Sequence, residues 1–267
     1  MADPEAHERA AARVRQLSAD YEPPDFAHVP GPDSALFLCA VDHRTGYRDR
    51  HLVDGAGPFE GSELLWAVGL RAARSRPGLL TAAALTEITA GDVADLFRAD
   101  AETVADPERR AALWRDLATG LLRDYGGSAA ALLASADGRL AGLGGLIDRL
   151  GAFEAYADPL AKKSFLFAKI AERRGWLTVS DPEAWEVSAD NVLMRIALRC
   201  GLVEPGELGQ VRAATREAFK RLAAEAEISV PVLDDLLWEL GRDDPDLLGS
   251  EAGDLREPSR DPASSWY

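Results

Sequence analysis

Residues 187–201, VSADNVLMRIALRCG, place a carboxylate where a helix begins. Val192, Ile196 and Cys200 recur at helical spacing, which predicts a helix with one buried face from Val192 onward. Asp190 stands just before this helix, where a short acidic side chain accepts hydrogen bonds from the first backbone amides. Those amides and the helix dipole also favour the ionised carboxylate. Asp190 is therefore either a helix cap alone or a cap that takes part in catalysis.

A second group of candidate residues begins after the apolar run ALFLCAV. Asp42 and His43 follow that run directly, and an acid next to a histidine at such a point is a candidate for recognising a base. Lys163 and Lys169 flank the run SFLFA and are candidate phosphate contacts, because an ammonium is a point-charge partner for phosphate. The alternative for all four is structural: turn residues for the first pair, and surface lysines with buried stems for the second.

Several other chemistries lack the residues that they need. The sequence has no GxSxG nucleophile motif, no Walker-type phosphate loop, and no HExxH or CxxC metal spacing. Cys39 and Cys200 are its only cysteines, and we expect them to be buried, reduced thiols of a cytoplasmic protein. We expect neither a metal nor a redox cofactor.

The charge balance argues against a nucleic-acid polymer as the partner. The chain has 45 acidic and 30 basic residues, a net charge of −15, whereas proteins that grip duplex DNA normally show a basic stripe. A small anionic substrate in a local basic pocket is easier to accommodate. No apolar run reaches the roughly 18 residues that span a bilayer. The charged N-terminus lacks the apolar region of a secretory signal, so we expect a cytoplasmic protein without membrane association.

Helix signals dominate the rest of the chain and predict an all-α fold. The residues that we expect at helix starts are Ser62, Thr81, Thr89, Pro107 and Ser128. ALFLCAV can be a strand or a buried helix, and residues 42–61 read as a polar, glycine-rich loop. We expect one helical domain over residues 1–242, which leaves room for two lobes, followed by a polar, acidic tail over residues 243–267.

The order of several motifs resembles that of known glycosylases. The acid-bearing segment, WEVSADNVLMRIALRCGLV, resembles the one in helix-hairpin-helix DNA glycosylases that delivers an Asp at the N-terminus of an Arg-containing helix. More broadly, the chain is similar to the queuosine salvage family, which are queuosine 5′-phosphate N-glycosylases. The segments that carry this similarity lie between Phe59 and Val203 and are FEGSELLWAVGLRAA, ERRAALWRDLATGLLRDYGGS and SFLFAKIAERRGW.

The resemblance implies a glycosylase-like helical fold and an N-glycoside hydrolase. Asp190 would then be the general base that also stabilises the oxocarbenium ion, and no metal or other cofactor would be needed. The residues expected to bind the substrate are Asp42, His43, Phe59, Lys163, Phe165, Lys169 and Arg195. The implied substrate is a small nucleoside 5′-monophosphate that carries a modified, queuine-like base, and of the two lysines Lys163 is the favoured phosphate contact.

Two departures from these families keep alternatives open. The hairpin of the DNA glycosylases needs a glycine-rich turn to hold a DNA phosphate, and the matching stretch YADPLAKKSFLF contains no glycine. The aromatic NF-x-FW segment of the queuosine family is poorly matched by LFLCAVDHRTGY, which points to a different base. The alternatives are a DNA base-excision glycosylase and a non-catalytic nucleotide-binding relative. No pattern indicates an oligomeric state.

Overall fold

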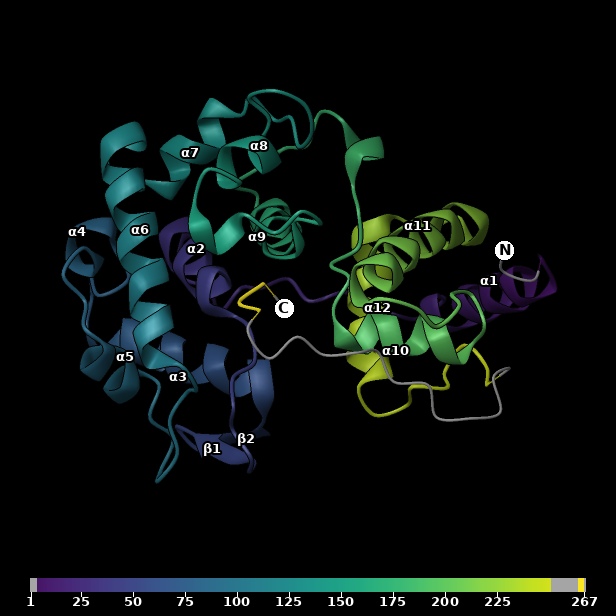
Figure 1. Cartoon of the computed structure of the whole chain (residues 1–267), viewed down its shortest axis with the longest axis horizontal. Helices are drawn as coiled ribbons and strands as arrows, with labels where there is room; N and C mark the ends of the chain where they lie inside the picture. The colour runs from purple at the N-terminus through teal and green to yellow at the C-terminus, as the bar shows by residue number, and fades with distance from the viewer. Residues whose placement is uncertain (1–3, 251–263, 267) are drawn as a thin grey trace. The chain divides into compact units, whose positions relative to one another are not determined.

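The computed structural model describes residues 4–250 and 264–266 and confirms the all-α fold (Figure 1). Within these residues the chain forms twelve α-helices, two short 3-10 helices and one two-stranded antiparallel sheet. None of the described helices is long and apolar enough to cross a membrane.

The described residues form two compact units. The first unit contains residues 4–25, 183–250 and 264, and the second contains residues 26–182, 265 and 266. The sequence predicted one helical domain with room for two lobes, and the contacts within the chain give two units with these limits. Each unit has its own core and is described separately.

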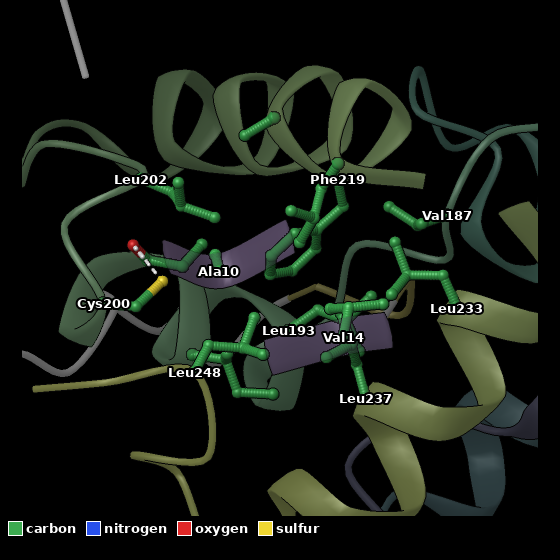
Figure 2. Close-up of a cluster of buried hydrophobic side chains, with 14 of the residues drawn as sticks. Ala10, Val14, Val187, Leu193, Cys200, Leu202, Phe219, Leu233, Leu237 and Leu248 are labelled. Carbon is green, nitrogen blue, oxygen red and sulfur yellow. Dashed lines mark hydrogen bonds between the residues drawn. The ribbon is translucent and has the colours of Figure 1, made fainter. Parts of the chain in front are cut away.

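Four helices build the first unit around an apolar core. They are α1 (Pro4–Ser18), α10 (Asn191–Arg199), α11 (Leu208–Ala226) and α12 (Val230–Gly241). Figure 2 shows side chains of all four meeting in this core, among them Val14, Leu193, Phe219 and Leu237. Val187, from the segment that precedes α10, is also fully buried there. The core thus fixes the backbone that leads into the helix predicted to carry Asp190.

The second unit is assembled around α2 (Pro32–Val41). Its remaining elements are β1 (His51–Val53), β2 (Ala56–Phe59), α3 (Gly61–Ser75), α4 (Ala82–Leu85), α5 (Ala90–Leu96), α6 (Pro107–Tyr125), α7 (Ala129–Ser135), α8 (Leu146–Leu150), the 3-10 helix Glu154–Tyr156 and α9 (Lys162–Arg173). Helix α2 packs against α3, α6, α7 and α9. All residues from 35 to 41 are buried, so the run ALFLCAV is a helix covered on every side. This explains why it shows no amphipathic period.

Two polar aromatic side chains bind the backbone of α2. The indole N–H of Trp114 donates to the carbonyl of Phe37 at 2.6 Å, and the hydroxyl of Tyr156 donates to the carbonyl of Leu36 at the same distance. Both side chains are buried, and a buried indole or phenol usually finds such a partner. These bonds tie α6 and the Glu154–Tyr156 helix to α2.

Most predicted helix ends are confirmed. Thr89 caps α5 in a capping box with Asp92, and Ser128 caps α7 by accepting a hydrogen bond from the amide of Ala131. Helix α6 begins at Pro107 and ends at Tyr125, and its C-cap is Gly126, whose φ of 60° lies in the left-handed region that glycine adopts without strain.

The segment between α2 and α3 differs from its prediction as a plain loop. It contains the hairpin of β1 and β2, in which His51 pairs with Phe59 and Val53 with Ala56. The hairpin is also tied to a neighbouring loop, because the two ring nitrogens of His51 lie 3.0 Å from the Asp100 carboxylate and 2.9 Å from that of Glu102.

Part of the predicted acidic tail belongs to the first unit. Leu247 and Leu248 are buried in its core, and Asp246 forms an ion pair with Arg199 of α10. Residues 251–263 and 267, which the prediction also covers, lie outside the described residues.

Candidate active site

The predicted site residues divide between the two units. Asp190 and Arg195 belong to the first unit, and the other six predicted residues, from Asp42 to Lys169, belong to the second. The two groups are therefore described one after the other.

Asp190 is the N-cap of α10, as the sequence predicts. Its backbone is extended, and its Oδ1 accepts hydrogen bonds from the amides of Val192 at 2.9 Å and Leu193 at 3.1 Å. The side chain is half-buried. An aspartate at this position satisfies amides that the helix itself leaves without partners, and it sits at the positive end of the helix dipole. Both capping bonds are made to Oδ1, and they hold the carboxylate at the start of α10.

Arg195 binds the end of another helix. One of its terminal nitrogens donates to the carbonyl of Gly241 at 3.2 Å and to that of Arg242 at 3.4 Å. These carbonyls lie at the C-terminal end of α12, where a helix has acceptors without intrahelical partners and where a cation is favoured. These bonds give Arg195 a structural role, and its predicted contact with the substrate stays a prediction.

Asp42 forms the C-cap of α2 and receives donors from α3. The hydroxyl of Ser62 lies 2.8 Å from each carboxylate oxygen, and the indole nitrogen of Trp66 lies 3.2 Å from Oδ2. Asp42 is buried, and a buried carboxylate needs such donors. The prediction that Ser62 caps α3 is wrong: the helix begins at Gly61 with Glu60 as N-cap, and the hydroxyl of Ser62 serves Asp42 instead.

His43 and Lys163 form a buried pair at the same end of α2. The ammonium of Lys163 donates to the carbonyl of Ala40 at 2.6 Å and lies 3.1 Å from Nδ1 of His43. Lys163 is fully buried, and His43 is 2% exposed. The carbonyl of Ala40 is one of the last four of α2, which have no donor within the helix, so Lys163 acts as a C-terminal cap of α2. A lysine at the surface was expected, and this one is in the interior.

Burial and positive charge both keep the imidazole of His43 neutral. Burial lowers the pKa of His43 well below its ordinary value, and the charges of Lys163, Arg110, Arg44 and Lys162 lower it further. Burial also lowers the pKa of Lys163 well below its ordinary value. When Lys163 donates to Nδ1, the ring proton resides on Nε2, and this atom is buried without a hydrogen-bond partner among the described residues.

Arg110 holds the loop that carries His43. Its guanidinium donates to the carbonyls of His43, Arg44 and Ala105, and it is fully buried. Burial lowers the pKa of Arg110 to about 10. The sequence did not single out this residue, because Arg110 in the segment PERRAALW looks like any arginine on a helix surface.

The remaining predicted residues contribute apolar surface and charge to the second unit. Phe59 is half-buried and packs against a small cluster that includes Val53, Leu64 and Val68. Phe165 and Lys169 are both buried and lie four residues apart on α9, which places them on the same face of that helix. The structure thus brings Asp42, His43 and Lys163 to one end of α2, with Phe165 and Lys169 farther along α9.

Both groups contain ionisable side chains. Within residues 4–250 and 264–266, no three histidine, cysteine, aspartate or glutamate side chains come close enough together to hold a metal ion. Comparison with protein-family profiles finds no matching family, and comparison with curated proteins finds no significant match. The chemistry of the site residues therefore has to carry the functional argument.

Proposed function

We propose that the chain is an N-glycoside hydrolase that releases a modified, queuine-like base from a nucleoside 5′-monophosphate. The observation that carries the proposal is Asp190, a half-buried carboxylate that the amides of Val192 and Leu193 hold at the N-terminus of α10. The similarity of the surrounding motifs to the queuosine salvage family, in order and spacing, supports the same activity.

The proposed reaction needs only water and a carboxylate. The bond between C1′ of the ribose and the ring nitrogen of the base breaks, and its electron pair leaves with the base. The carboxylate of Asp190 stabilises the positive charge that develops on the sugar ring. Water then forms a bond to C1′ and gives one proton to the carboxylate, the departing base takes one proton from solvent, and the carboxyl returns its proton to solvent. The products are the free base and ribose 5-phosphate.

The proposed phosphate contact of Lys163 is revised. Its ammonium donates a hydrogen bond to the carbonyl of Ala40 and lies next to His43, so these contacts favour an internal helix cap over a phosphate contact for Lys163. The proposed substrate keeps its 5′-phosphate, and no lysine is assigned to bind it.

The test is to incubate the full chain with a panel of modified nucleosides, their 5′-monophosphates and lesion-bearing duplex DNA, and to detect released base by mass spectrometry. We expect release from a 5′-monophosphate and not from DNA. Release from DNA, together with micromolar affinity for undamaged duplex and a steep salt dependence, would favour a DNA glycosylase. Binding of nucleotides without any release would identify a non-catalytic relative and overturn the proposal.

A further inference from the structure

The segment that delivers Asp190 is extended and deeply buried. Val187 and Ala189 are almost fully buried, and Ser188 is 7% exposed. Because this segment precedes α10 and belongs to no helix or strand, its backbone groups cannot be satisfied by a regular ladder. Buried amides and carbonyls that lack such partners need side-chain partners instead.

Two charged side chains supply those partners. The carboxylate of Asp234, on α12, accepts a hydrogen bond from the amide of Ser188 at 2.6 Å. The guanidinium of Arg212, on α11, donates through Nε to the carbonyl of Ala189 at 3.4 Å. Asp234 is 4% exposed and Arg212 is 5% exposed, so both contacts lie inside the unit.

These contacts act on the two residues directly before Asp190. One helix holds the amide of Ser188 and another holds the carbonyl of Ala189, while α10 holds Asp190 itself through the amides of Val192 and Leu193. Three helices therefore determine where the backbone of Asp190 lies. Burying a charged side chain costs free energy unless it forms hydrogen bonds. Here Asp234 and Arg212 each form one with a backbone group of the same short segment.

We propose that Asp234 and Arg212 are positioning residues that fix the carboxylate of Asp190 for the reaction. This inference rests on the proposed function. Neither residue needs to touch the substrate: each acts through the backbone of residues 188 and 189. A small displacement of a reacting group is enough to reduce turnover strongly, because the geometry of attack is demanding.

The central comparison uses Asp234→Ala and Asp234→Asn in the full chain. The asparagine retains a carbonyl oxygen that can accept from the amide of Ser188, whereas the alanine does not. We expect kcat for base release to fall about 100-fold in Asp234→Ala with little change in KM, and to be largely restored in Asp234→Asn. The contact of Arg212 is longer and therefore weaker, so we expect about a 10-fold loss in Arg212→Met.

A matched control separates positioning from general loss of stability. Phe219→Leu, on α11, weakens the same apolar core and removes no hydrogen bond to the held segment. It should lower the melting temperature while leaving kcat unchanged well below that temperature. A loss of kcat in Phe219→Leu equal to that in Asp234→Ala, or a kcat of Asp234→Ala equal to that of the wild type, would overturn the inference.

A second readout distinguishes failure of this inference from failure of the proposed function. Hydrogen exchange and chemical shifts of the amides of Ser188, Val192 and Leu193 report the hold on the segment and the cap made by Asp190. We expect all three amides to lose protection in Asp234→Ala and to keep it in Asp234→Asn. If the wild type releases no base, the proposed function fails, and these amides still decide whether Asp234 fixes Asp190. Unchanged protection of Val192 and Leu193 in Asp234→Ala would refute the positioning role.

Discussion

The start of α10 and the end of α2 hold polar groups in two different ways. At the start of α10, Asp190 is half-buried, and backbone amides bind its carboxylate. At the end of α2, Asp42, His43 and Lys163 are buried. The carboxylate of Asp42 accepts a hydrogen bond from Ser62, and the ammonium of Lys163 donates to the carbonyl of Ala40 and lies next to the ring of His43. A half-buried carboxylate on a helix cap can meet a solute at little cost to the fold. The side chains of a fully buried cluster are used in its internal hydrogen bonds, so substituting one of them should first lower the stability of the fold.

The largest effect should follow from Asp190→Asn. Asparagine caps helices as well as aspartate does, so the free energy of unfolding should change by less than about 0.5 kcal/mol. The charge that stabilises the sugar cation is lost, so kcat should fall by about 100- to 1,000-fold. Base release and chemical denaturation measured on the same sample check both expectations. Turnover of the variant at the wild-type rate would reduce Asp190 to a cap.

At the end of α2 the order of effects should be reversed. Lys163→Ala removes a buried side chain and the donor to the carbonyl of Ala40, so we expect the free energy of unfolding to fall by about 3 kcal/mol. Lys220→Ala is the matched control, because Lys220 pairs with Glu186 while 40% exposed, and its loss should cost less than about 1 kcal/mol. Equal effects of the two variants in chemical denaturation would contradict an internal cap.

A smaller loss of stability is expected for Ser62→Ala. Its hydroxyl donates to the buried carboxylate of Asp42, and hydrogen bonds to charged groups contribute about 2 kcal/mol. Ser75→Ala, on the same helix, removes a hydroxyl that binds only the carbonyl of Ala72 and should change the unfolding free energy by less than about 1 kcal/mol. A loss in Ser62→Ala no greater than that in Ser75→Ala would show that Asp42 does not depend on this donor.

The last comparison separates two histidines of the second unit by the pH dependence of their contributions to stability. The pKa of His43 is lowered, mainly by burial, so the stability that its neutral form provides is present above the unfolded pKa and is lost as the pH falls below about 6.5. The pKa of His51 is raised, first by its hydrogen bond to Glu102 and then by that to Asp100. Its contribution is complete below about 6.5 and is lost as the pH rises through its folded pKa.

Substitution of each histidine by glutamine should therefore change the pH profile of the unfolding free energy in opposite directions. His43→Gln should flatten the acid side of the profile, by at most about 1.4 kcal/mol per pH unit. His51→Gln should remove a stabilisation that is complete below about pH 6.5 and is lost as the pH rises through the folded pKa of His51. Profiles that stay parallel to that of the wild type would contradict the lowered pKa of His43 and the raised pKa of His51.

What the sequence predicts well is local. The N-cap at Asp190, the start of α6 at Pro107 and its C-cap at Gly126 depend on residues within one helical turn, and all three are confirmed. The run ALFLCAV could not be assigned because a helix buried on all sides has no polar face. The hairpin was missed because its strands, His51–Val53 and Ala56–Phe59, are too short to show alternation.

What the sequence does not predict are partners that lie far along the chain. Asp234 lies 46 positions after Ser188, with α10 and α11 between them in the sequence, so no local pattern predicts their contact. The pair Asp234-Asp235 within the apolar segment VPVLDDLLWEL was nevertheless a usable signal of a buried polar role. Lys163 was expected at the surface because lysines are seldom buried, and the carbonyl that holds it belongs to a residue more than a hundred positions earlier. The capping position of Asp190 was predictable, but the residues that hold its segment were not.

The two buried cysteines give each unit its own chemical reporter. Cys39 lies in α2 of the second unit and Cys200 follows α10 of the first, and burial raises the pKa of Cys39 far above its ordinary value. Neither thiol can be alkylated until the structure around it opens, because the reagent needs an accessible thiolate. Labelling rates at the two positions, resolved by mass spectrometry, therefore measure local opening in each unit separately. One molecule can thus report whether its two units unfold together or one at a time.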